Sequence, residues 1–282
     1  MEIFKRVVNK VLYTQIRLKW YIDYFRVRNQ ISFKRNVISL SRGVKLILLP
    51  HVDDEWIGCS QIINNYPNVV LCDMDMPGGD SQYIHKKRKE ELKKLCDTKR
   101  ISSILLDNNK VGKLTEIIKE TGCSEIFLPY LVDWHPEHLK VHDIVASVLD
   151  NINSEMTIIM YQVSVPISDD HINFVIPMNK QTLINKWNLF RYFYPSQKHL
   201  PSRRFLLQER INGAYVGAYA AEVYCAKNKK EWLSAKRSFA LSLCDHNSFV
   251  SNLNNIYEMR NLVKRIGSNL FDYEIISKGK DS

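Results

Sequence analysis

The stretch Leu46–Gly58, which reads LILLPHVDDEWIG, decides the fold of this 282-residue chain. It opens with a continuous apolar run that ends at Pro50, and such a run is typical of a strand buried on both faces of a parallel sheet. One imidazole and three carboxylates follow directly, from His51, Asp53, Asp54 and Glu55. Because ligands bind at the carboxyl ends of strands in open α/β sheets, the stretch predicts a site, and its side chains suit a divalent metal ion.

A second stretch repeats this arrangement later in the chain. The short apolar run Ile126–Leu128 ends at Pro129. The residues that follow include Asp133, Trp134, His135, Pro136, Glu137 and His138. Since the strand ends of one parallel sheet meet at the same edge, we expect the two clusters to lie together. Each acid alone could be a helix N-cap, but two matching clusters with a full set of metal-binding side chains favour a site.

Together the two clusters resemble the PIG-L/LmbE-like family of zinc-dependent N-deacetylases, which includes N-acetylglucosaminyl-phosphatidylinositol deacetylases. The family carries a His-Pro-Asp-Asp-Glu signature after its first strand and a His-Pro-Asp-His signature later. Here they stand as His51-Val52-Asp53-Asp54-Glu55 and His135-Pro136-Glu137-His138. Valine replaces proline in the first and glutamate replaces aspartate in the second, and neither change touches an expected ligand. The resemblance covers roughly residues 44–163, with a weaker match near Ser196-Gln197.

The resemblance implies one metal ion per chain. It assigns Zn²⁺, with Fe²⁺ as the alternative, to His51, Asp54 and His138. Three protein ligands with an open fourth position are what a catalytic zinc site requires. No separate cofactor-binding residues are implied, and a G-x-G-x-x-G sequence, the main signature of dinucleotide binding, does not follow the first strand.

The same resemblance leaves Asp53 and His135 for the chemistry. We expect Asp53 to take a proton from the attacking water and to return it to the leaving amine. His135 is expected to stabilise the oxyanion as an imidazolium, with Glu137 or Asp133 as its orienting partner. His142, one turn further along the same predicted helix, is expected to be an exposed helical residue, with support of a metal ligand as the alternative.

Strands and helices alternate through the middle of the chain. This alternation predicts an α/β fold with a Rossmann-like, mostly parallel sheet flanked by helices. The expected strands cover residues 44–49, 68–74, 103–106, 125–128, 157–163 and 174–177. The expected helices cover residues 55–64, 82–99, 113–120, 136–149, 180–194, 228–245 and 250–266. Glycines at 78 and 79 would allow a tight loop near a ligand, although a solvated turn is an equal alternative.

The N-terminus differs from the rest in charge. Residues 1–36 hold nine lysines and arginines against two acids, a net charge of +7 out of +10 for the whole chain. We therefore divide the chain into a basic amphipathic N-terminal extension, residues 1–43, and an LmbE-like deacetylase domain with a helical C-terminal part, residues 44–282. Basic residues mixed with aromatic ones at helical spacing suit a helix in the membrane interface, or one packed on the core or on a second subunit. Nucleic acid is a third partner for basic segments, but no nucleic-acid-binding motif supports it.

Other features of the sequence indicate the cellular compartment of the protein. No apolar stretch reaches the 18 residues of a spanning helix, and the N-terminus lacks the apolar core and cleavage site of a signal peptide. The six cysteines form no Cys-x-x-Cys pair and read as reduced core residues. We expect a cytoplasmic protein, with peripheral contact through residues 1–36 at the inner face of the membrane. The sequence does not give the oligomeric state.

The expected function is metal-dependent hydrolytic N-deacetylation. The substrate would be an N-acetylated amino sugar of the N-acetylglucosamine type, free or linked to lipid, in glycan or glycoconjugate biosynthesis. Two alternatives stay open, a hydrolase of another small N-acyl group and a catalytically inactive protein that binds sugar or lipid.

Overall fold

The computed structural model describes most of the chain, namely residues 2–31, 40–76, 79, 81–197, 200, 202–241, 246–268 and 270. Part of the N-terminal extension predicted at 1–43 lies outside these residues, and so does Gly78 of the glycine pair.

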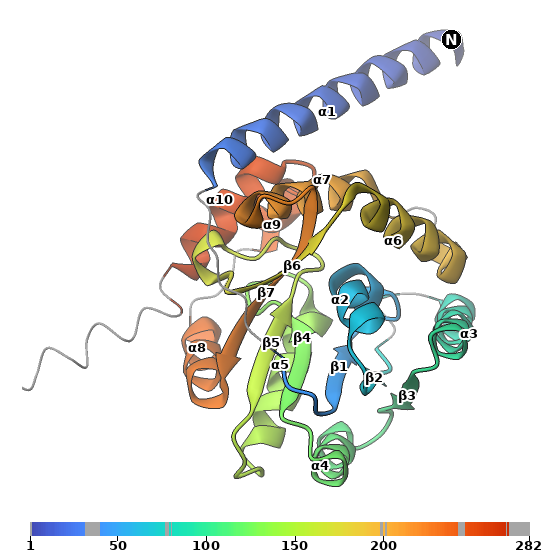
Figure 1. The fold of residues 1–282 in the computed structure, drawn as a ribbon. Coiled ribbons are helices and arrows are strands. Elements are labelled where there is room, and N and C mark those ends of the chain that lie inside the picture. Colours follow the sequence, from blue (N-terminus) through green and yellow to red (C-terminus); the bar gives the residue numbers. More distant parts are fainter. Residues whose placement is uncertain are drawn as a thin grey trace, which may run out of the picture.

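Seven strands form one mixed sheet, which confirms the predicted α/β fold (Figure 1). The spatial order is β3-β2-β1-β4-β5-β7-β6. The first five strands are parallel, whereas β7 runs antiparallel to both β5 and β6. The strands are β1 (Lys45–Leu49), β2 (Val69–Asp73), β3 (Ser102–Leu105), β4 (Glu125–Pro129), β5 (Thr157–Tyr161), β6 (Phe174–Met178) and β7 (Ala220–Asn228).

Helices cover both faces of this sheet. Alternation along β1 sends Leu46 and Leu48 into a core shared with α4, α5 and α8, while Ile47 and Leu49 join a core shared with α2, α3 and α6. A strand buried on both faces is what the continuous apolar run predicts. The helices are α1 (Glu2–Gln30), α2 (Asp54–Asn65), α3 (Gln82–Lys99), α4 (Lys110–Thr121), α5 (Pro136–Leu149), α6 (Lys180–Phe193), α7 (Ser202–Gly213), α8 (Lys229–Leu241), α9 (His246–Ser251) and α10 (Ile256–Gly267). Three short 3₁₀ helices complete the set: η1 (Asp169–His171), η2 (Pro195–Gln197) and η3 (Ala214–Val216).

The strand order creates a switch point between β1 and β4. From β1 the chain moves outward through β2 and β3, and from β4 it moves the opposite way to β5. The helices that leave two such neighbouring strands pass to opposite faces, which opens a crevice at the carboxyl ends of the strands. Both polar clusters follow these two strands, so the topology brings them together.

Three parts of the C-terminal half differ from expectation, and one of them is strand β7, which was not among the expected strands. The single helix predicted at 250–266 is wrong, because the chain turns at residues 252–255 and Asn255 caps a new helix, accepting a hydrogen bond from the Glu258 N–H at 3.2 Å. Helix α7 was not expected at all. Helix α8 matches the helix predicted at 228–245 as far as Leu241, and residues 242–245 lie outside the description.

A buried ion network anchors α2 to the C-terminal half. The Lys186 ammonium, 2% exposed, donates to the Ile57 carbonyl at 2.7 Å, to Glu222 at 2.6 Å and to Glu209. The indole of Trp56 donates back to the Lys186 carbonyl at 2.9 Å. Because buried charges are tolerated only when paired, this network fixes the helix that begins at Asp54.

The N-terminal helix α1 is continuous over 29 residues. Its C-terminal half lies on α7 and α10, where three of its side chains enter a small core: Trp20, Tyr24 and Val27. The N-terminal half projects away from the body (Figure 1), and every described side chain from residue 6 to residue 19 is exposed. Among the residues described, no helix has both the length and the apolar character required to cross a membrane.

Candidate metal centre

The turn after β1 folds one carboxylate back over the strand end. Pro50 ends the strand, and Asp54 opens helix α2 three residues after His51. The Asp54 carboxylate accepts a hydrogen bond from the His51 backbone N–H at 3.0 Å through Oδ2. The side chains of these two residues therefore face the same point beyond the sheet.

Three ligand atoms form an almost equilateral triangle. Asp54 Oδ2 lies 3.3 Å from His51 Nδ1 and 3.4 Å from His138 Nε2, and the two nitrogens are 3.3 Å apart. Donors held tetrahedrally at about 2.0–2.1 Å from a zinc ion are themselves about 3.3–3.4 Å apart. The spacing of the three side chains therefore fits one face of a tetrahedral metal site.

Each histidine of the triangle is held by a carboxylate through its other nitrogen. Glu137 Oε2 lies 2.5 Å from His51 Nε2, and Asp133 Oδ2 lies 2.8 Å from His138 Nδ1. Such a carboxylate fixes the proton on the outer nitrogen and leaves the inner lone pair for a cation. These contacts correct one expectation, because Glu137 and Asp133 orient the rings of His51 and His138 and not the ring of His135.

The carboxylates of the cluster stabilise a positive charge at its centre. Burial alone would lower the pKa of His138, but the carboxylates of Asp133 and Asp54 raise it to about 10. Burial would raise the pKa of Asp54, yet the two histidines outweigh it and hold that pKa below its usual range. A buried imidazole that keeps its proton so strongly marks a place where a metal cation could supply the charge instead.

Asp53 sits on a strained backbone. Its φ of 122° lies in the positive half of the Ramachandran plot, where residues other than glycine are rarely found. Its N–H donates to Glu55 Oε2 at 3.0 Å, and Glu55 also accepts a hydrogen bond from the Tyr194 hydroxyl. Strain of this kind costs about 1–3 kcal/mol and is found where surrounding contacts impose it, often at functional sites.

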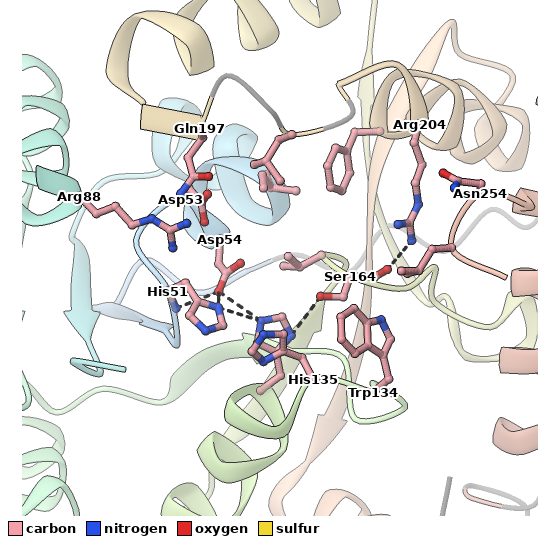
Figure 2. Close-up of a pocket in the computed structure, with 16 residues that line it drawn as sticks. His51, Asp53, Asp54, Arg88, Trp134, His135, Ser164, Gln197, Arg204 and Asn254 are labelled. Atoms are coloured by element: carbon pink, nitrogen blue, oxygen red, sulfur yellow. Dashed lines mark hydrogen bonds and ion pairs between the residues drawn. The ribbon is translucent and has the colours of Figure 1, made fainter. Parts of the chain in front are cut away.

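The Asp53 side chain faces the pocket. Burial and the neighbouring Asp54 carboxylate raise its pKa well above the usual range, and the guanidinium of Arg88 acts in the opposite direction. Figure 2 shows Arg88 and Gln197 pointing toward Asp53. Burial beside a second carboxylate therefore makes Asp53 hold a proton more readily than an ordinary carboxyl group, which suits a side chain that transfers protons.

His135 completes the cluster beside the triangle. Its ring centre lies 4.6 Å from that of His51 and 4.8 Å from that of His138. Candidate ligand atoms of these three histidines all lie within 4.8 Å of one another. Burial and the two neighbouring imidazoles lower the pKa of His135 to about 4. This corrects the expected imidazolium, because the surroundings keep the ring neutral.

A cavity of about 390 Å³ opens above the cluster. Its walls come from segments far apart in the sequence, and besides the cluster it is lined by Arg88, Trp134, Gln197, Arg204 and Asn254 (Figure 2). Arg204 Nη2 donates to the Ser164 carbonyl at 2.5 Å, which places its guanidinium on the pocket wall. The sequence favoured a solvated loop for Arg204, with contact to a phosphate or a sugar hydroxyl as the alternative, and nothing in the sequence indicated Asn254.

The segment that holds Ser196 and Gln197 lies at this wall. Glu91 of α3 accepts hydrogen bonds from the Ser196 N–H at 2.9 Å and from its hydroxyl at 2.5 Å. These contacts hold Gln197, 3% exposed, against the pocket. His142 was expected to be exposed, but it is buried at 1% and stacks on Trp232, away from the cavity lining.

Comparison with known proteins supports the fold. The conserved protein TT1542 from Thermus thermophilus is similar, with a TM-score of 0.52 at 16% identity over 64% of this chain and 93% of that one. A triple mutant of a deacetylase from the teicoplanin biosynthetic pathway and the A40926 pseudoaglycone deacetylase align with TM-scores of 0.49 and 0.48, at 16% and 13% identity. Each alignment covers 66% of this chain and 98% of the other. No protein-family model matches the chain, and no curated protein does.

Proposed function

We propose that this chain is a metal-dependent hydrolytic N-deacetylase that acts on an N-acetylated amino sugar of the N-acetylglucosamine type, in glycan or glycoconjugate biosynthesis. One observation carries the proposal, the triangle of His51, Asp54 and His138 with a carboxylate behind each ring. We assign these three residues to the metal, zinc first and iron(II) as the alternative. The two signature sequences that resemble PIG-L/LmbE-like deacetylases support the same assignment.

An amide resists hydrolysis for two reasons, since water is a weak nucleophile and the tetrahedral intermediate carries an oxyanion. A bound divalent cation lowers the pKa of water and polarises the carbonyl group. Asp53 would accept a proton from the attacking water while the oxygen of that water forms a bond to the carbonyl carbon. It would then deliver that proton to the amine nitrogen as the C–N bond breaks, so that acetate and a free amine leave.

His135 would act as a neutral donor. Its Nδ1 accepts the Glu137 backbone N–H at 3.3 Å, which places the ring hydrogen on Nε2. A neutral imidazole with this hydrogen directed at the carbonyl oxygen stabilises charge as it develops there. The role needs no protonated ring, in agreement with the lowered pKa of His135.

The pocket wall supports an amino sugar as substrate. The buried amide of Gln197 has no hydrogen-bond partner among the described residues, and a buried polar group of this kind gains most from a ligand that pairs with it. The guanidinium of Arg204 and the aromatic face of Trp134 add a donor and an apolar surface. Sugar rings offer hydroxyls and apolar faces in this combination, whereas a small acyl amide would leave most of these groups unused.

The test exchanges each neighbouring carboxylate for its amide. Asp54→Asn removes an anionic ligand, so metal affinity should fall and activity should recover in part with excess zinc. Asp53→Asn keeps the shape but removes the proton acceptor, so metal should stay while turnover falls about 10²-fold or more. Bound metal is measured by elemental analysis, and acetate release is followed on a panel of N-acetylated amino sugars and sugar lipids.

Three outcomes would count against the proposal. Metal loss in Asp53→Asn with retention in Asp54→Asn would mean that the two roles are exchanged. Acetate release only from small acyl amides would favour a different hydrolase. Sugar or lipid binding without hydrolysis in zinc-loaded protein would favour the inactive binding protein.

A further inference from the structure

The outward face of α1 carries an apolar stripe that no other part of the described structure covers. Five residues of the stripe are 49–61% exposed: Val7, Val11, Leu18, Ile22 and Phe25. Each residue advances an α-helix by about 100°, so these five lie within a strip about 60° wide. Exposed apolar side chains aligned in this way usually mark an interaction surface.

The stripe lies opposite the face that holds α1 to the body. Trp20, Tyr24 and Val27 point toward α7 and α10, about half a turn away from the stripe. The Trp20 indole donates to the Asn254 carbonyl at 2.6 Å. The helix is therefore anchored along one side and free to present the other, and the stripe cannot be the face that packs on the chain's own core.

Cations border the stripe on both sides. Lys10, Arg17 and Arg28 follow one edge of the helix, and Lys19 and Arg26 follow the other. Toward the body end of the helix, Arg28 donates to the Tyr24 hydroxyl and Arg26 stacks on Tyr257 of α10, so Lys10, Arg17 and Lys19 are the cations that face outward. The described part of α1 has a single acid after residue 5, Asp23, which is buried at 3% on the body side. An apolar strip between two rows of long basic side chains is the pattern of a helix that lies in a membrane interface, with its cations at the lipid phosphates.

We propose that α1 docks this protein on an anionic phospholipid bilayer, with Val7, Val11, Leu18, Ile22 and Phe25 inserted and the flanking cations on the headgroups. A second copy of this chain is a poorer occupant. Pairing two such stripes would bring the basic rows of the two helices side by side, and like charges repel across such a contact.

The docking helix is connected to the pocket. Asn254, which accepts the hydrogen bond from Trp20, also lines the cavity above the candidate metal centre. Docking would therefore hold the rim of the cavity close to the bilayer surface. The proposal does not depend on the proposed function, because lipid binding is measured without substrate and without turnover.

The experiment is co-sedimentation of the full chain with vesicles at low and high salt. Vesicles of phosphatidylcholine with phosphatidylglycerol should bind the protein, pure phosphatidylcholine vesicles should bind it far less, and salt should weaken the binding. The variant Leu18→Glu/Ile22→Glu should lose binding by about tenfold or more, because it places charges in the inserted strip. The variant Lys10→Gln/Lys19→Gln, with one change on each edge, should lose binding to the anionic vesicles by a similar factor.

A matched control makes the same chemical change elsewhere. Ile184→Glu/Tyr83→Glu replaces two exposed apolar side chains on α6 and α3 by glutamate, and it should bind as the unmodified protein does. Unchanged near-ultraviolet circular dichroism would show that each variant keeps its fold.

Equal binding of the Leu18→Glu/Ile22→Glu variant and its control would overturn the proposal. So would equal binding to both vesicle types at every salt concentration. If vesicles bind nothing and light scattering shows a dimer that Leu18→Glu/Ile22→Glu converts to a monomer, a second copy covers the stripe and the proposal is wrong.

Discussion

Replacement of Asp133 by asparagine tests whether the carboxylates behind the rings set the metal-binding state of the site. Asp133 is 1% exposed and accepts two hydrogen bonds, from the His138 Nδ1–H at 2.8 Å through Oδ2 and from the His135 backbone N–H at 2.9 Å through Oδ1. In the Asp133→Asn variant the amide oxygen can keep the second bond, so the local backbone should remain in place. The amide NH₂ would then face His138 Nδ1 and favour the hydrogen on Nε2, the atom of the triangle.

The expected magnitude follows from this change of tautomer. Loss of a carboxylate that orients a ligating histidine lowers metal affinity by about 10–100-fold. That factor corresponds to about 1.4–2.7 kcal/mol in binding free energy. The assay is zinc titration against a competing chelator, with the melting temperature of the metal-free protein as a check on folding.

The control carries the same substitution on helix α5. Asp143 is 66% exposed at its side chain and pairs with Lys236 on the surface, so Asp143→Asn should leave zinc affinity unchanged. Equal zinc affinity of the Asp133→Asn and Asp143→Asn proteins would refute the reasoning, because zinc binding would then not depend on the carboxylate of Asp133.

Two further predictions concern the contacts that hold α2 against the rest of the fold. Gly58→Ala would place a methyl group 2.3 Å from the Tyr161 ring, so we expect a loss of about 1–3 kcal/mol in the free energy of unfolding, measured in urea, together with weaker zinc binding. Lys186→Met would leave two buried carboxylates without their cation, and we expect a loss of about 3–5 kcal/mol by the same measurement. Added Glu209→Gln and Glu222→Gln changes should restore part of that stability, and a Lys186→Met protein of unchanged stability would contradict this account of the network.

Most of the fold could be predicted from the sequence because its central strands are buried on both faces. Such strands appear as uninterrupted apolar runs, and each breaker residue then marks a strand end. Strand β7 was not among the expected strands, and its direction could not have been read in this way either, since an apolar run does not encode whether its neighbour is parallel. Helix α7 was missed because its buried residues Leu207 and Ile211 pack against α1, a partner about 180 residues earlier in the chain.

The candidate site, too, could be predicted from the sequence only in part. His51, Asp54 and His138 follow two strand ends, and the strand ends of one parallel sheet share an edge, so the two clusters could be expected at the same edge. The choice of these three ligands was what the family resemblance implied. The carboxylates that hold the histidine rings could not be predicted. Glu137 and His51 belong to different segments of the chain, and their contact depends on the tertiary fold. Gln197 ends the short helix η2 and Asn254 lies in the turn between α9 and α10, and the place of both on the pocket wall depends on what these segments pack against.

The acid at position 55 shows how the fold maintains the site. Glu55 is fully buried and takes no part in the triangle. Its carboxyl group accepts the Asp53 N–H and the Tyr194 hydroxyl, and burial raises its pKa to about 7, so we count each as an ordinary hydrogen bond of about 0.5–1.5 kcal/mol. That is enough to offset about 1–3 kcal/mol of strain at the positive φ of Asp53. The third acid of the signature sequence is therefore best understood as the brace that keeps Asp53 pointed into the pocket.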